Sequence, residues 1–236
     1  LSYLIQGSPK PIVLTGAQKP IGFDSTDSKT NLMDAFLCAS EDLPGVSIVF
    51  NGKVIPGTRA KKTRSKSFQA FSSINYPYLG ILRDGVLLRY IRPDCGEAPV
   101  FYDRLDSRVA LLKLVPGMDR EAADFLLERN DALIIESFGV GGLPESGGFY
   151  HCVDEAMAAG KTVVLTTQVE NEGSDVGVYH VGHALKNKLG VLEAYDMTTE
   201  AVVAKLMWIL GQTKERQEIG RLFYTPVAKD ILWPVE

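Results

Sequence analysis

Residues 11–16 have the sequence PIVLTG, a short and continuously apolar run that is rich in β-branched side chains. Such a run is typical of a strand that is buried on both faces in a parallel sheet. Open α/β sheets bind their ligands beyond the carboxyl ends of these strands. The residues at the end of the run, Thr15-Gly16-Ala17-Gln18, are therefore a candidate part of a binding site.

Two helices are predicted on either side of this run. Residues 1–6 are expected to be the last turns of an amphipathic helix that ends at Gly7. Another helix is expected over residues 27–40, capped by residues 25–27. Its expected apolar face consists of Leu32, Ala35, Phe36 and Ala39.

Hairpins and alternating elements are predicted for the rest of the chain. Asn51-Gly52 favours a type I′ turn between strands at residues 46–50 and 53–55, and Asp84-Gly85 favours a second hairpin. In the second half, strands are expected over residues 108–115, 132–135 and 161–167, and helices over residues 119–129, 147–159, 176–188 and 197–210. This alternation predicts an α/β fold in both halves.

The composition is that of an ordinary globular protein. The chain has 236 residues, of which 45% are hydrophobic and 23% charged, and this excludes a disordered or fibrous protein. The net charge of −4 disfavours general nucleic-acid binding, which needs clustered cations. We therefore expect no nucleic-acid partner. We expect no membrane partner either, since no apolar run is long enough to span a membrane.

Cysteines and histidines are few and widely spaced. Their positions predict neither a disulfide framework nor a zinc site: Cys38, Cys95, Cys152, His151, His180 and His183. The histidines are expected on helix surfaces rather than in catalysis. We therefore expect no metal site and a reducing, cytoplasmic location.

A basic stretch follows the first hairpin. Residues 57–80 contain five cations and no acidic residue, although the whole chain is acidic: Arg59, Lys61, Lys62, Arg64 and Lys66. The simplest interpretation is a solvated basic loop. Hydroxyl side chains alternate with these cations and aromatic residues follow them, so a lysine here could instead be desolvated. Desolvation would lower its pKa toward the range in which it accepts a proton.

A break in the apolar pattern divides the chain. Residues 93–99 carry proline and glycine around acidic residues, which is typical of a linker. We expect one domain over residues 1–92, a linker over residues 93–104 and a second domain over residues 105–236. The glycines at residues 139–142 follow an expected strand but lack the full GxGxxG pattern, so dinucleotide binding is not favoured.

Several separate motifs resemble those of the bacterial type I, cytoplasmic L-asparaginases, in that family's order. They are Thr15-Gly16-Ala17-Gln18-Lys19-Pro20, Asp27 with Asn31-Leu32, the basic stretch, Glu136-Ser137-Phe138-Gly139, Thr166-Thr167-Gln168, Asp196-Met197-Thr198-Thr199-Glu200 and Lys205-Leu206. The resemblance implies a two-domain α/β enzyme, with a flavodoxin-like amino-terminal domain, truncated here, and a smaller α/β carboxy-terminal domain. It also implies a homodimer or homotetramer that hydrolyses L-asparagine to L-aspartate and ammonia without metal or cofactor.

The mechanism that this resemblance implies uses two threonines in turn. One, in a TGGT-like segment, is the nucleophile, and the other, in a GTDT segment, belongs to a Thr-Lys-Asp relay that moves the proton. Only the lysine has a match here, which is Lys62, with the neighbouring Lys61 as the alternative. By the same resemblance, the backbone of Gly16 and Ala17 meets the substrate amide. A strand end that requires small residues would explain these two positions equally well.

Other motif residues have structural explanations. Asp27 and Asn31 are expected to cap and anchor a helix, and Thr198 and Thr199 are expected to belong to a capping box. By the same resemblance, Gly142 stands where some relatives carry an asparagine that contributes to a neighbouring subunit's site. The sequence therefore does not predict whether residue 142 makes a contact between subunits.

Neither threonine motif occurs in the 236 residues, which contain no TGG and no HGTDT. We therefore expect the chain to lack two to three βαβ-sized units, on the order of 80 to 100 residues, and to be inactive on asparagine by itself. Two alternatives remain. One is an asparaginase-like subunit of an archaeal tRNA amidotransferase, and the other is a non-catalytic module that binds asparagine or mediates assembly.

Overall fold

The computed structural model describes residues 1–178 and 190–232, which group into two compact units. Unit 1 comprises Leu1–Asp103 and Val227–Asp230, and unit 2 comprises Arg104–Pro226 and Ile231–Glu236. The segment Val227–Asp230 near the end of the chain therefore belongs to unit 1, although the residues on both sides of it belong to unit 2. Compactness does not test which residues fold as independent domains, so the division into residues 1–92, 93–104 and 105–236 stays a prediction.

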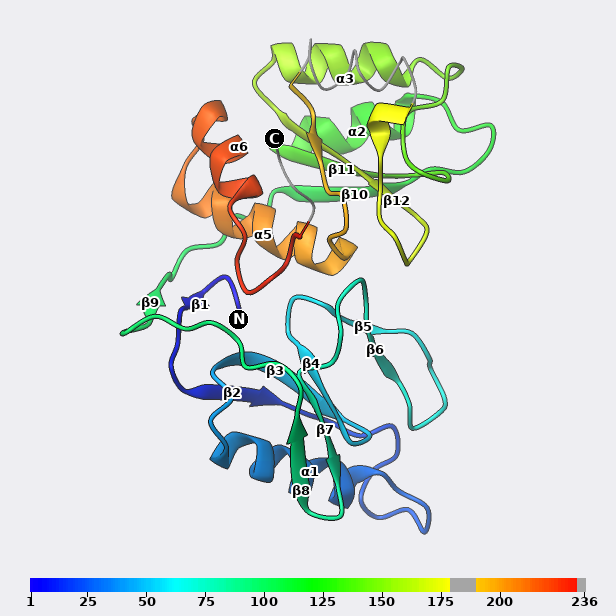
Figure 1. Cartoon of the computed structure of the whole chain (residues 1–236). Coiled ribbons are helices and arrows are strands. Elements are labelled where there is room, and N and C mark those ends of the chain that lie inside the picture. Colours follow the sequence, from blue (N-terminus) through cyan, green and yellow to red (C-terminus); the bar gives the residue numbers. More distant parts are fainter. Residues whose placement is uncertain (179–189, 233–236) are drawn as a thin grey trace. The chain divides into compact units, whose positions relative to one another are not determined.

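The main sheet of unit 1 has five strands in the order β2-β3-β4-β7-β8. Their bounds are β2 Pro11–Leu14, β3 Gly45–Phe50, β4 Lys53–Pro56, β7 Gly80–Arg83 and β8 Val86–Arg89. Strands β2 and β3 are parallel and are joined by helix α1 (Ser28–Ser40), which lies along one face of the sheet (Figure 1). The other pairs are antiparallel. At the β3–β4 turn, Asn51 and Gly52 have φ of 51° and 70°, which confirms the predicted hairpin.

Burial in unit 1 differs from the prediction at α1 and β2. Helix α1 buries Asn31, Ala35 and Cys38. Of the predicted apolar face only Ala35 is buried, because Leu32 and Phe36 are 45% and 63% exposed and Ala39 is exposed too. The small side chains of α1 pack closely on a core that includes Leu43, Val49, Val54, Leu79 and Leu82. Strand β2 is only partly buried, contrary to the prediction, because it lies at one end of the strand order.

Two short antiparallel pairs complete the described strands of unit 1. Strand β1 (Ile5–Gln6) pairs with β9 (Val100–Phe101), and β5 (Ala60–Lys62) pairs with β6 (Phe71–Ser73). The helix expected over residues 1–6 is wrong, because a single turn leads directly into β1. The partner of β1 lies far along the chain, and such a pairing has no local signature.

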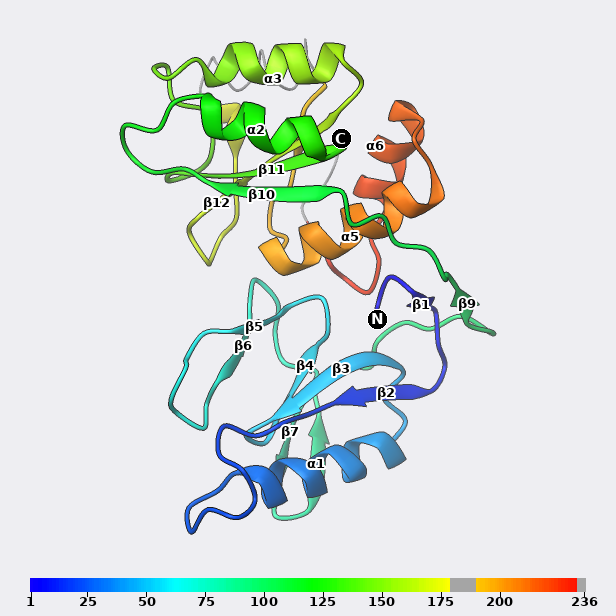
Figure 2. The same ribbon diagram turned by 180° about the vertical axis from the view of Figure 1, so that it is seen from behind.

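Unit 2 is built on a parallel sheet with the strand order β10-β11-β12-β13. Its elements are β10 Val109–Lys113, β11 Ala132–Ser137, β12 Thr162–Thr167, β13 Leu192–Glu193, α2 Glu121–Arg129, α3 Phe149–Ala158, α5 Thr199–Gln212, α6 Arg216–Tyr224 and the 3₁₀ turn η1 Val176–Val178. Helices α2 and α3 lie on one face of the sheet and α5 on the other (Figure 2). The α/β fold predicted for this half is therefore confirmed.

The strands expected over residues 108–115, 132–135 and 161–167 and the helices expected over residues 119–129, 147–159 and 197–210 are confirmed, with bounds that differ by at most two residues. The sequence does not predict helix α6 or strand β13. Of the helix expected over residues 176–188, only η1 is described, and the remaining residues, with His180 and His183, lie outside the described residues. Within the described residues, no helix is long and apolar enough to cross a membrane.

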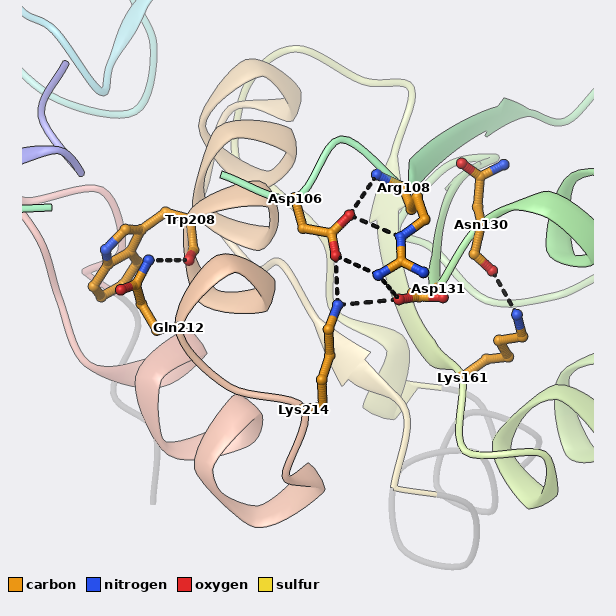
Figure 3. A network of polar contacts seen from close by, with 8 residues as sticks. All are labelled: Asp106, Arg108, Asn130, Asp131, Lys161, Trp208, Gln212 and Lys214. Atoms are coloured by element: carbon orange, nitrogen blue, oxygen red, sulfur yellow. Dashed lines mark hydrogen bonds and ion pairs between the residues drawn. The ribbon is translucent and has the colours of Figure 1, made fainter. Parts of the chain in front are cut away.

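An ion cluster joins three segments of unit 2 (Figure 3). The Asp106 carboxylate accepts hydrogen bonds from the Arg108 side chain at 3.1 and 2.7 Å and from Lys214 Nζ at 2.6 Å. Arg108 and Lys214 each also lie 3.0 Å from Asp131 Oδ2. The cluster therefore fixes the entries to β10 and β11 against the connection between α5 and α6.

Candidate functional site

The loop after β2 is held by two buried side chains of α1 and its entry. The carboxylate of Asp27 accepts hydrogen bonds from the N–H groups of Gln18 at 3.0 Å and Lys19 at 3.1 Å. The amide of Asn31 donates to the carbonyl of Gly16 at 2.9 Å and to Asp27 at 3.1 Å. Asp27 occupies the N-cap position without a side-chain cap bond, so the capping role expected for it is wrong. Both residues anchor the loop instead.

The charge on Asp27 follows from these bonds. Burial by itself opposes ionisation, but hydrogen bonds from the N–H groups of Gln18 and Lys19 and from the Asn31 amide outweigh it and lower the pKa of Asp27. The carboxylate therefore remains ionised at neutral pH and is engaged by the loop. Its chemistry is that of an anchor rather than of a proton acceptor.

The anchored loop exposes the two small residues that the sequence singled out. Gly16 and Ala17 are both solvent-exposed at the carboxyl end of β2. A Cβ atom on Gly16 would lie 4.0 Å from the ring of Phe50, so the backbone here runs close to an aromatic surface. Exposed backbone held in one conformation can offer N–H and carbonyl groups to a ligand.

Lys62 lies on the hairpin formed by β5 and β6. It is paired with Phe71, whose ring packs on that of Phe50 with 5.1 Å between centroids. Lys62 is therefore the strand partner of Phe71, and Gly16 lies beside Phe50, the ring on which Phe71 packs. The side chain of Lys62 is exposed, so the desolvation considered for a lysine of this stretch does not occur at this residue.

Strand alternation separates the two candidate lysines. Neighbouring residues of a strand point to opposite faces, so Lys61 points away from the face that Lys62 shares with Phe71. Within the described residues, no hydrogen bond or ion pair engages the Lys62 ammonium. The hairpin is also tied to the β2 loop, since Gln18 Nε2 donates to the carbonyl of Ser67 at 3.1 Å. This geometry favours Lys62 over Lys61 as the lysine that faces the loop.

The motif residues of unit 2 bond mainly to each other. Thr199 donates to Glu136 Oε1 at 2.6 Å, and Gln168 donates to the carbonyls of Leu114 and Glu136 at 2.7 and 3.0 Å. Thr198 accepts from the N–H of Ala201 at 3.1 Å and so caps α5, as predicted. The capping box expected for Thr198 and Thr199 is wrong, because the third residue of α5 is Ala201 and Thr199 bonds Glu136 instead. No sequence pattern indicates the contact between Thr199 and Glu136, because the two residues lie on different elements.

The part of the chain that the structure describes brings together no group of three His, Cys, Asp or Glu side chains suited to a metal ion. The region near the end of β2 contains the exposed Lys62, the backbone of the anchored loop at Gly16 and the packed rings of Phe50 and Phe71. One cation of the basic stretch, Arg59, also belongs to this region. Arg59, directly before β5, is fully buried, and no local pattern distinguishes it from its exposed neighbours.

Fold and site together define an α/β protein of two units whose candidate site offers backbone groups and a lysine. Family models extend this picture: "Asparaginase, N-terminal" matches residues 1–93, and "Glutaminase/Asparaginase C-terminal domain" matches residues 108–223. The L-asparaginase of Thermococcus kodakarensis is 37% identical over 233 residues, which cover 98% of this chain and 70% of that protein. The chain therefore belongs to the asparaginase/glutaminase family.

Two further comparisons agree with this assignment. The solved structure of the thermostable L-asparaginase from Thermococcus kodakarensis matches with a TM-score of 0.94 and 34% identity, covering 99% of this chain and 71% of that one. A subunit of the glutamyl-tRNA(Gln) amidotransferase of Pyrococcus furiosus is 32% identical over 244 residues, covering 98% of this chain and 55% of that protein. The chain thus spans about half the length of that second relative.

Proposed function

We propose that the protein that contains this chain is an L-asparaginase, which hydrolyses L-asparagine to L-aspartate and ammonia. The observation that carries the proposal is the 37% identity to a protein named L-asparaginase across 98% of this chain. The family membership makes it an amidohydrolase by homology. In unit 1, Lys62, the exposed loop at Gly16 and Ala17 and the rings of Phe50 and Phe71 are compatible with the binding of a small polar amide.

Three residues receive roles in this proposal. Gly16 and Ala17 contact the substrate amide through their backbone groups, and Lys62 belongs to the relay that moves a proton. The hydroxyl that adds to the amide carbon comes from a threonine that is not among these 236 residues. Ammonia then leaves with a proton, and water releases aspartate from the acyl intermediate. Support for Lys62 is its exposure on the face of the hairpin that packs on Phe50.

The identity to an amidotransferase subunit favours a second candidate function. A subunit of that kind would hand ammonia to a partner instead of releasing it. The chain is 37% identical to the asparaginase and 32% identical to the amidotransferase subunit, and it is acidic, which favours the free enzyme. A non-catalytic module that binds asparagine would show saturable binding without turnover.

Location, assembly and domains are proposed with the activity. The three cysteines are free in the structure, which is compatible with a reducing, cytoplasmic location. We propose a homodimer or homotetramer, and domains over residues 1–92 and 105–236 with a linker between them.

Ammonia release tests the proposal. The protein produced from its whole gene is incubated with L-asparagine alone, and ammonia and aspartate are both quantified. Equal amounts of the two products without any partner protein support the L-asparaginase. Ammonia release that requires a partner subunit would instead support the amidotransferase, and saturable binding without products would support the non-catalytic module.

A further inference from the structure

The segment Val227–Asp230 contacts the residues that lead into the Lys62 hairpin. The hydroxyl of Thr58 donates to the carbonyl of Ala228 at 2.8 Å, and Nε of Arg59 donates to the carbonyl of Lys229 at 2.6 Å. Thr58 and Arg59 directly precede β5. All of these residues belong to unit 1, although the segment lies about 170 residues further along the chain than the hairpin.

The segment has a backbone conformation that needs support. Ala228 and Lys229 have φ of 50° and 59°, a left-handed conformation that is unfavourable for residues other than glycine. The turn is closed by Asp230, whose carboxylate accepts from the N–H of Val227 at 2.8 Å and whose own N–H donates to the carbonyl of Val227 at 3.1 Å. This conformation presents two successive carbonyls to Thr58 and Arg59.

Buried charges lie where the segment meets the hairpin. Arg59 and Asp230 are both 0% exposed, and Tyr3 donates to the Asp230 carboxylate at 2.9 Å. Burial, followed by the negative charge and the hydrogen bond of Asp230, raises the pKa of Tyr3, and the positive charge of Arg59 opposes this rise. The charges of Asp230 and Arg59 therefore both influence the hydroxyl group of Tyr3. Removing one partner of such a buried pair leaves an uncompensated charge, so the loss of either Arg59 or Asp230 would be strongly destabilising.

Arg59 connects this cluster to the hairpin itself. Its carbonyl accepts a hydrogen bond from the N–H of Ile74 at 2.9 Å, which closes the base of the hairpin where β6 ends. Its guanidinium lies 5.8 Å from the ring centre of Tyr76. One residue thus links both strands of the hairpin to the segment Val227–Asp230.

We propose that the segment Val227–Asp230 is a positioning element that holds the β5–β6 hairpin in place and thereby sets the position of Lys62. Thr58 and Arg59 are the positioning residues through which it acts. The consequence for catalysis rests on the proposed function, in which Lys62 moves a proton. The structural part does not depend on that function, since it concerns only the order of the hairpin.

Two substitutions of Thr58 form a matched test. Thr58→Val keeps the shape of the side chain and removes the donor to Ala228, whereas Thr58→Ser keeps the donor. Hydrogen exchange of the protein produced from its whole gene is followed at Thr63 and Ile74, whose amides bond within the hairpin, and at the amides of the β3–β4 pair. In Thr58→Val we expect the hairpin amides to exchange about tenfold faster, the β3–β4 amides to be unchanged, and Thr58→Ser to match the wild type.

Three results would overturn the proposal. They are unchanged exchange of the hairpin in Thr58→Val, equal acceleration of the hairpin and the β3–β4 pair, and a Thr58→Ser variant that exchanges like Thr58→Val. Asp230→Asn is a harsher second variant because it removes a buried negative charge, and the Thr58 pair remains decisive if Asp230→Asn does not fold.

Steady-state kinetics with asparagine distinguish a failure of this positioning proposal from a failure of the proposed L-asparaginase function. In the protein produced from its whole gene, Thr58→Val should lower kcat for asparagine more than it changes KM, and Thr58→Ser should restore kcat. A faster-exchanging hairpin with an unchanged kcat would overturn the link to Lys62. Absence of ammonia release by the wild type would refute the L-asparaginase and leave the exchange result to decide the structural part.

Discussion

Replacing Asn31 with alanine tests whether α1 holds the loop that presents Gly16. The Asn31 side chain donates to the carbonyl of Gly16 at 2.9 Å and to the Asp27 carboxylate at 3.1 Å, and it accepts from the N–H of Asn51 at 2.9 Å. Asn31 is itself 1% exposed, so the amide that makes these three bonds is shielded from water. With about 1 kcal/mol for each bond, we expect the free energy of unfolding to fall by about 3 kcal/mol.

A matched substitution controls for the loss of an asparagine as such. Within the described residues, the side chain of Asn130 makes one hydrogen bond, from its amide to the carbonyl of Leu126 at 2.8 Å, at the end of α2. Asn130→Ala should therefore cost about 1 kcal/mol or less. Urea-induced unfolding followed by circular dichroism compares both variants with the wild type. A loss for Asn31→Ala no larger than that for Asn130→Ala would refute the anchoring role of Asn31.

Two more predictions concern unit 2. Hydrogen bonds from the Arg108 side chain, and then from Lys214, hold the pKa of Asp106 below its usual range. The ionised Asp106 carboxylate therefore contributes its full stabilisation of the fold at pH values above the usual pKa of an aspartate, and this contribution is lost as the pH falls. The excess in Tm of the wild type over Asp106→Asn should be largest at neutral pH and shrink in acid, and a difference independent of pH would contradict this. Thr198→Ala should lower the free energy of unfolding by about 1 kcal/mol because α5 loses its cap, while Thr198→Ser should not. Urea unfolding checks this second prediction, and equal stability of both variants would contradict it.

Local chemistry made much of the fold predictable. The turn residues Asn51 and Gly52 need positive φ, and this requirement is visible in the sequence. The strands β11 and β12 are buried almost throughout and have the continuous apolar runs that parallel sheets require. Prediction failed where contacts with neighbouring segments decide which side chains are buried. Helix α1 buries Asn31 because the strand ends beside it need a hydrogen-bonding partner.

The candidate site was predictable only in part. The strand end at Gly16 and the basic stretch with Lys62 are visible in the sequence. The structure places Gly16 beside Phe50 and Lys62 opposite Phe71, and these two rings pack on each other. The return of Val227–Asp230 to unit 1 could not be predicted, because it depends on contacts between residues far apart in the sequence.

The most direct test of the account compares Lys62→Ala with Lys66→Ala in the protein produced from its whole gene. Both lysines are exposed and belong to the same basic stretch, but only Lys62 lies on the face of β5 shared with Phe71. The measured quantity is the rate of ammonia release from L-asparagine. We expect Lys62→Ala to lower kcat by at least about 100-fold, the usual effect of losing a proton-transfer group, and Lys66→Ala to retain the rate of the wild type. Full activity in Lys62→Ala, or a loss that appears in Lys61→Ala instead, would contradict the assignment of Lys62 to the relay.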